Sequence, residues 1–186
     1  VEELLQKADS QLNTDAANVQ TLLRAVATEE GEFELPVPAE RMIALRAAVR
    51  TLLPALDEGF VGTVKAYMQK ANEDGLDGMV DVLRKLLQTY ASERLFVLVD
   101  SRMEPAIASA VRSMLEAPPE TWDEVMREQL LSSDASCGAD ELLGALQDQM
   151  GEVVLGMPAG SAVQTVLAEY LNEMLSLARG IAAEDA

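Results

Sequence analysis

The stretch "VPAERMIALRAAVRTLLPAL", residues 37–56, decides the fold class of this 186-residue chain. Its apolar side chains recur every three or four residues, the spacing that places them on one face of an α-helix. They are Met42, Ile43, Leu45, Val49, Leu52, Leu53 and Leu56. Arg41, Arg46 and Arg50 take the opposite side or its border, and Pro38 suits a first helical turn. The pattern predicts an amphipathic helix with one buried face.

The same spacing continues through nearly all of the chain, and no segment shows the convincing alternation of a β-strand. A second strong stripe runs from Met79 to Tyr90, directly after the turn-rich sequence "NEDGLDG" at 72–78. Further helices are expected over 2–28, 57–71, 103–116, 121–132, 139–155 and 161–182. We therefore predict an all-α fold, a helical bundle of about seven or eight helices.

The first segment differs from the others, because its apolar positions are sparse until its last third. We interpret residues 1–28 as an N-terminal helical arm that packs either on the bundle or on a partner. The sequence "EEGEFELPVP" at 29–38 is the best candidate for a linker. Residues 39–186 are then expected to form the helical bundle domain.

The net charge limits the classes of partner that the chain can bind. The 32 acidic residues against 14 basic ones give a formal net charge of −18. Such a surface repels phosphates, so we predict no nucleic acid partner. With 49% apolar residues, the chain is expected to fold rather than to act as a disordered acidic tail. No apolar run approaches the roughly 20 residues of a transmembrane helix, so no membrane span is predicted. Because the first residue is Val1 and not methionine, we expect the chain to begin after a cleavage or trimming.

The chain has no histidine, which excludes Ser-His-Asp and Cys-His nucleophile pairs and histidine-bearing metal sites within a single copy. The single cysteine, Cys137, forms no internal disulfide, and the nearby Asp140 and Glu141 are expected to raise its thiol pKa. We interpret Cys137 as a small residue in a turn. No catalytic residue, cofactor or metal is predicted.

Two alternative functions stay open at this stage. Neighbouring carboxylates can hold Mg²⁺ and act as acid and base, which allows a carboxylate-dependent and Mg²⁺-dependent enzyme. The pairs are Asp123/Glu124, Asp57/Glu58 and Glu73/Asp74. The other alternative is a small-molecule carrier with an interhelical pocket around Met79, Tyr90 and Trp122.

The only tryptophan stands in "EAPPETWDEVM", residues 116–126. Thr121 with Glu124 fits a capping box, so the proline pair ends one helix and a new helix begins. Trp122 and Met126 share a face of that helix, and we interpret Trp122 as a core residue. The alternative is an interface anchor, because exposed tryptophans dominate binding hot spots. The candidate residues for a partner interface are Trp122, Met126, Arg41, Arg46 and Arg50.

Two segments, "VKAYMQKANEDGLDGMVDVLRKLLQTYASERL" at 64–95 and "MLEAPPETWDEVMREQL" at 114–130, carry a resemblance to a known family. The chain resembles uncharacterised helical chloroplast proteins that are sometimes labelled endoribonuclease-E-like. The resemblance implies a processed, soluble protein of the plastid stroma and transfers no catalytic residue. The sequence shows neither the acidic metal site nor the basic RNA track that a ribonuclease would need.

These observations favour a non-enzymatic, acidic helical interaction protein. We expect a peripheral subunit or an assembly or adaptor factor of a larger organellar complex, such as a photosystem with its antenna. The partners are then proteins, including a large membrane complex contacted from its soluble side. Basic stromal loops of such a complex would complement the acidic surface.

Overall fold

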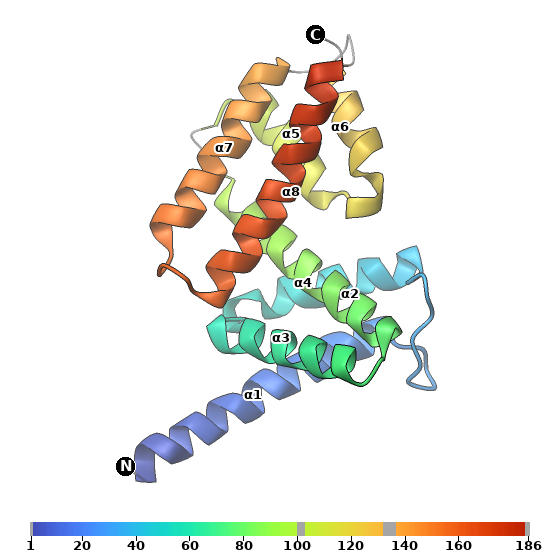
Figure 1. Ribbon diagram of the computed structural model, residues 1–186, viewed down its shortest axis with the longest axis vertical. Helices are drawn as coiled ribbons and strands as arrows, with labels where there is room; N and C mark the ends of the chain where they lie inside the picture. The colour runs from blue at the N-terminus through green and yellow to red at the C-terminus, as the bar shows by residue number, and fades with distance from the viewer. Residues whose placement is uncertain (1, 100–102, 132–136, 185–186) are drawn as a thin grey trace. The chain divides into compact units, whose positions relative to one another are not determined.

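A computed structural model describes residues 2–99, 103–131 and 137–184 of the chain (Figure 1). These residues form eight α-helices and two short 3-10 turns and contain no strand, which confirms the predicted all-α fold. The elements are α1 (Glu2–Val26), α2 (Ala39–Leu52), η1 (Leu53–Ala55), α3 (Glu58–Glu73), α4 (Asp77–Leu98), α5 (Pro105–Glu116), η2 (Pro119–Thr121), α6 (Trp122–Leu131), α7 (Ala139–Gly156) and α8 (Ala162–Glu184). Within the same described ranges, no helix is long and apolar enough to cross a membrane.

The chain divides into two compact units, an N-terminal unit of Val1–Tyr90 and a C-terminal unit of Ala91–Ala186. This division differs from the predicted arm at 1–28, linker at 29–38 and single bundle at 39–186. The boundary between the units falls inside the continuous helix α4, where no proline, glycine or polar run marks a change. A change in composition can mark a loop between two units. This boundary lies within a helix, and its position depends on which helices pack together.

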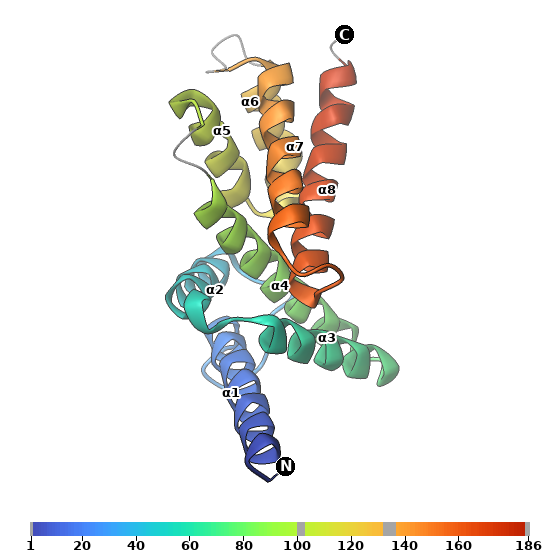
Figure 2. The ribbon, with the colours of Figure 1, turned by 90° about the vertical axis from the view of Figure 1, so that its left-hand side faces the viewer.

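One part of helix α1 packs into the core of the N-terminal unit, and another part projects from it. Its C-terminal half packs against α2 and α3 and buries Val19, Leu22 and Val26. Residues 6–14 are exposed, and this part of the helix extends beyond its neighbours in the N-terminal unit (Figures 1 and 2). The sparse apolar pattern over residues 6–14 therefore has a physical cause, because this part of the helix has no core to face.

Helix α2 buries a narrower face than its sequence predicts. Leu45 and Val49 are fully buried, as expected, but Ile43 is 71% exposed. A residue two positions before Leu45 lies about 200° away around the helix, so the same neighbours cannot cover both side chains. The prediction that Ile43 belongs to the buried stripe is therefore wrong.

The C-terminal unit is built around α7 and α8, which pack along each other, while α6 lies against α8 and α5 against α7 (Figure 2). Trp122 is 2% exposed and meets Tyr170 of α8 edge to face, with ring centroids 5.0 Å apart. Its indole Nε1 donates to the carbonyl of Ala117 at 3.1 Å, so the polar edge of this large core residue is satisfied. The interpretation of Trp122 as a core residue is confirmed.

The start of α6 differs in detail from the predicted capping box. The Thr121 hydroxyl donates to the carbonyl of Pro118 at 3.0 Å, and the short turn η2 leads directly into the helix. The second proline of the pair, Pro119, opens η2, where its missing N–H costs nothing.

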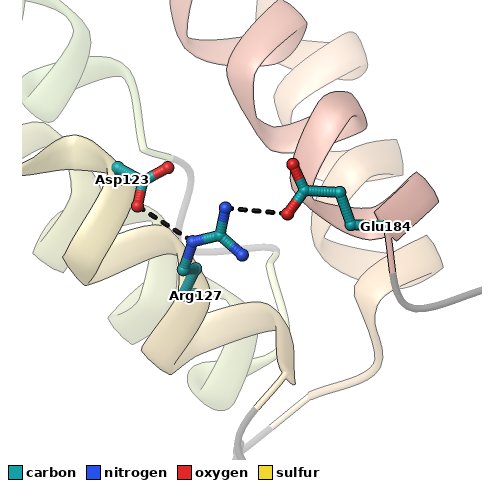
Figure 3. A network of polar contacts seen from close by, with 3 residues as sticks. All are labelled: Asp123, Arg127 and Glu184. Carbon is teal, nitrogen blue, oxygen red and sulfur yellow. Dashed lines mark hydrogen bonds and ion pairs between the residues drawn. The ribbon is translucent and has the colours of Figure 1, made fainter.

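A polar contact joins α6 to α8 at the surface of the C-terminal unit (Figure 3). Arg127 donates to Asp123 one turn earlier at 2.9 Å and to Glu184 of α8 at 2.8 Å. These hydrogen bonds raise the pKa of Arg127 above its ordinary value. All three side chains are exposed, so the network adds little to stability.

Candidate functional site

A shallow groove runs between the start of α5 and one face of α7 in the C-terminal unit. The residues before and within α5 that line it are Met103, Glu104 and Ile107. The residues of α7 that line it are Glu141, Gly144, Ala145, Gln147, Asp148, Gly151, Glu152 and Leu155. They recur at helical spacing, so this groove follows the outward face of α7 over most of its length.

Two glycines keep the α7 side of the groove open. Gly144 and Gly151 lie seven residues apart, about two turns, and therefore on one face of the helix. A Cβ at either position would meet no atom within 4 Å, so the packing of the C-terminal unit does not require glycine there. Glycine inside a helix costs about 1 kcal/mol relative to alanine. The fold therefore carries this cost without an internal reason for it.

One end of the groove is apolar and open. Leu155 is 88% exposed and its neighbour Val154 is 52% exposed, both in the last turn of α7. The apolar side chains that line the α5 side of the groove, Ile107 and Met103, are half-buried. A large apolar side chain exposed along an open groove, as Leu155 is, is typical of a surface that binds another molecule.

The charged groups that line the groove are all acidic, and no Lys or Arg is among its lining residues in the described ranges. Glu104 comes from the α5 side, while Glu141 and Asp148 come from α7, and all three are exposed. Glu104 and Glu141 both act electrostatically on the thiol of Cys137, which stands just before α7. Burial raises the pKa of the Cys137 thiol, and the negative charges of Glu141 and Glu104 raise it further. Acidic groups from both sides of the groove thus converge.

Two of the residues predicted for a partner interface have a different role. Trp122 is 2% exposed and Met126 is fully buried, because their shared face of α6 packs into the core of the C-terminal unit. Neither side chain offers surface to a partner in this fold. Both are corrected here from interface candidates to core residues.

The three predicted arginines lie on α2 in the N-terminal unit. Arg41 donates through Nη1 to the carbonyl of Ala27, just after the end of α1, so this half-buried guanidinium ties α2 to α1. Arg46 is half-buried and Arg50 is exposed, and both interact with other groups of the protein. Arg41 therefore serves the fold, while an interface role for Arg46 and Arg50 stays a prediction.

Two of the carboxylates considered for Mg²⁺ have other structural roles. Asp57 accepts from the backbone N–H groups of Gly59 and Phe60 and so caps α3, and Asp123 binds Arg127. Over the described part of the chain, no cluster of three or more Cys, Asp or Glu side chains is arranged to hold a metal ion.

The residues considered for a carrier pocket lie in different cores. Tyr90 packs against Phe60 in the N-terminal unit, with ring centroids 5.6 Å apart, and its hydroxyl donates to the carbonyl of Leu56 at 3.3 Å. Trp122 packs against Tyr170 in the C-terminal unit. Each aromatic residue is thus occupied within its own unit, and Met79 is half-buried.

The groove was missed by the sequence reasoning, although one signal for it exists. Gly144 and Gly151 stand two turns apart in a segment whose other residues favour a helix. Glu141 and Asp148 have the same spacing, and each precedes one of the glycines by three residues. Glycines inside a helix that nothing in the fold demands point to a close approach from outside.

Comparisons of the chain with protein-family models, with curated proteins and with solved structures find no match. The resemblance of 64–95 and 114–130 to helical chloroplast proteins stays a prediction. The function is therefore inferred from the groove and from the charge of the chain.

Proposed function

We propose that the protein is a non-enzymatic interaction protein that binds a protein partner through the groove between α5 and α7. The observation that carries this proposal is the exposed end of α7, where Leu155 stands 88% exposed at the mouth of an acidic groove. A surface that combines an apolar anchor with a charged rim resembles a protein–protein interface more than a catalytic cleft.

The net charge of −18 supports a partner with a basic surface. Complementary charges accelerate association and select the partner, and they make the interaction sensitive to ionic strength. The same charge disfavours DNA and RNA, whose phosphates need Lys and Arg. A basic protein surface is therefore the partner that the electrostatics favour.

We place this activity in a peripheral subunit or an assembly or adaptor factor of a larger organellar complex. The plastid stroma, with a photosystem and its antenna as the complex, is the setting that the resemblance to chloroplast proteins favours. Basic stromal loops of a membrane complex would meet the acidic surface from the soluble side.

Isolation of the protein from its native cells, in mild detergent and at low salt, tests this function. Mass spectrometry of the recovered material should identify a complex in stoichiometric amount, and raising the salt should release the protein from it. Recovery of the protein alone, as a free monomer at low salt, would contradict the proposal.

A further inference from the structure

We propose that the groove between α5 and α7 receives a basic amphipathic α-helix of the partner, which lies along α7 with its backbone over Gly144 and Gly151. Its cationic side chains lie against Glu104, Glu141 and Asp148. This inference rests on the proposed interaction function and names the chemistry of the partner segment.

The floor of the groove has the form that a helix needs. Gly144 and Gly151 are separated by seven residues, roughly 10.5 Å along the axis of α7. Both glycines lie on the face of α7 that lines the groove, with Gln147 and Asp148 between them, and the space above each glycine is free of protein atoms within 4 Å of a Cβ. Helix axes approach most closely where small residues lie at the contact. The incoming backbone would thus occupy the space that side chains at these two positions would fill.

An extended segment fits this surface less well than a helix. A bound strand needs free backbone N–H and C=O groups at the edge of a sheet. The residues of α7 from Ala139 to Gly156 are helical, so their backbone groups are already paired within the helix. A helical partner satisfies its own backbone and presents only side chains, which is what this groove can accept.

The spacing of the acids predicts a register for the partner. Glu141, Asp148 and Leu155 are each seven residues apart, so they form a row beside the row of the two glycines. A helix lying along α7 should carry Lys or Arg at two positions seven residues apart. A large apolar residue seven positions further along should meet Leu155, which is exposed at the end of that row. Small residues should face the glycine row.

Binding of synthetic peptides to the full chain tests this proposal. The probe is a fluorescently labelled peptide of about six helical turns with Lys, Lys and Leu at seven-residue intervals and Ala on the groove-facing side, made in both chain directions. Fluorescence anisotropy at low salt should show saturable one-to-one binding for at least one direction. The comparison peptides carry Glu in place of both Lys residues, the same composition in scrambled order, or a central proline that breaks the helix.

Variants of the protein separate the groove from the rest of the surface. Gly144→Met and Gly151→Met fill the groove floor and should each weaken binding at least tenfold, while open space at both positions lets the variants fold. Gly180→Met on α8 is the matched control, because its Cβ also meets nothing within 4 Å and it lies outside the groove lining. The double variant with Glu141→Lys and Asp148→Lys should no longer bind the Lys peptide and should bind the Glu peptide instead.

The outcomes of these experiments distinguish a failure of the helical occupant from a failure of the proposed function. Equal binding of the scrambled or proline-containing peptide, or full affinity in Gly144→Met, overturns the helical occupant. A native complex that Gly144→Met and Gly151→Met retain as well as the wild-type chain also overturns it, while the general interaction function stands. Peptide binding as expected, with no complex recovered from cells, would instead count against the proposed function.

Discussion

The carboxylate of Asp15 in α1 lies directly against the backbone of Gly59 in the first turn of α3, so close that a Cβ at Gly59 would come within 2.3 Å of Oδ2. Asp15 is 1% exposed, and its other oxygen, Oδ1, accepts from the side chain of Gln11 at 3.2 Å. The N-terminus of a helix favours a negative charge, which suits this position of a buried acid. The acid of one helix therefore meets the end of another only because Gly59 has no side chain.

The contact predicts the effect of one added methyl group. We expect Gly59→Ala to lower the free energy of unfolding by about 1 to 3 kcal/mol, because the methyl overlaps the Asp15 carboxylate. Urea unfolding measures the change. Gly62→Ala on the same helix is the control, since a Cβ there meets nothing within 4 Å and should stabilise by about 0.5 to 1 kcal/mol. Equal effects of the two changes would contradict the proposed contact.

The buried amide of Gln149 predicts a stabilising substitution. Gln149 is 2% exposed on the core face of α7, and neither its Nε2 nor its Oε1 has a hydrogen-bond partner among the described residues. We expect Gln149→Met to raise the free energy of unfolding by about 1 to 3 kcal/mol, since an unpaired buried amide is replaced by an apolar group of similar shape. Thermal and urea unfolding measure the gain. The exposed Gln147→Met should stay within about 0.5 kcal/mol of the wild type; a destabilised Gln149→Met would mean that the amide is satisfied.

The single tryptophan gives a spectroscopic test of the core. Because Trp122 is 2% exposed and packs against Tyr170, its emission should be blue-shifted and weakly quenched by acrylamide in the folded protein. Unfolding should shift the emission to the red and make quenching efficient. Strong quenching of the native protein would show that Trp122 is open to solvent and would restore it as an interface candidate.

The thiol of Cys137 reports the acidity of the groove. Its raised pKa should keep the thiolate fraction low, so alkylation by iodoacetamide should reach its plateau at a higher pH than for a free thiol. Burial acts first, and the charges of Glu141 and Glu104 add to it. Glu141→Gln should therefore lower the thiol pKa and speed alkylation at about pH 8, just below the thiol pKa of about 8.5 in peptides.

The remote Asp123→Asn serves as the control for this pH profile, because Asp123 binds Arg127 and is not among the groups that shift the Cys137 pKa. The rates are measured from about pH 7 to pH 10, a range that brackets the ordinary thiol pKa. Identical profiles for Glu141→Gln and the wild type would argue against charge convergence at the groove.

Much of the local structure follows from short signals in the chain. The predicted start of every helix lies within two residues of the observed one. Ser161 accepts from the backbone N–H of Gln164 at 3.1 Å at the start of α8, and Asp57 caps α3. Caps, prolines and apolar periodicity act over a few residues, so they can be recognised without knowledge of the rest of the molecule.

Which helix faces pack against each other cannot be recognised from such local signals. Three features depend on residues that are distant in sequence. They are the contact of Trp122 with Tyr170, the burial of only part of α1, and the unit boundary within α4. The groove exists because α5 lies beside α7, which places Glu104 near Glu141. Helical periodicity shows that a face is apolar or acidic but not which neighbour covers it. That choice is made by packing between distant segments, and it assigns Trp122 to the core and leaves Leu155 at the surface.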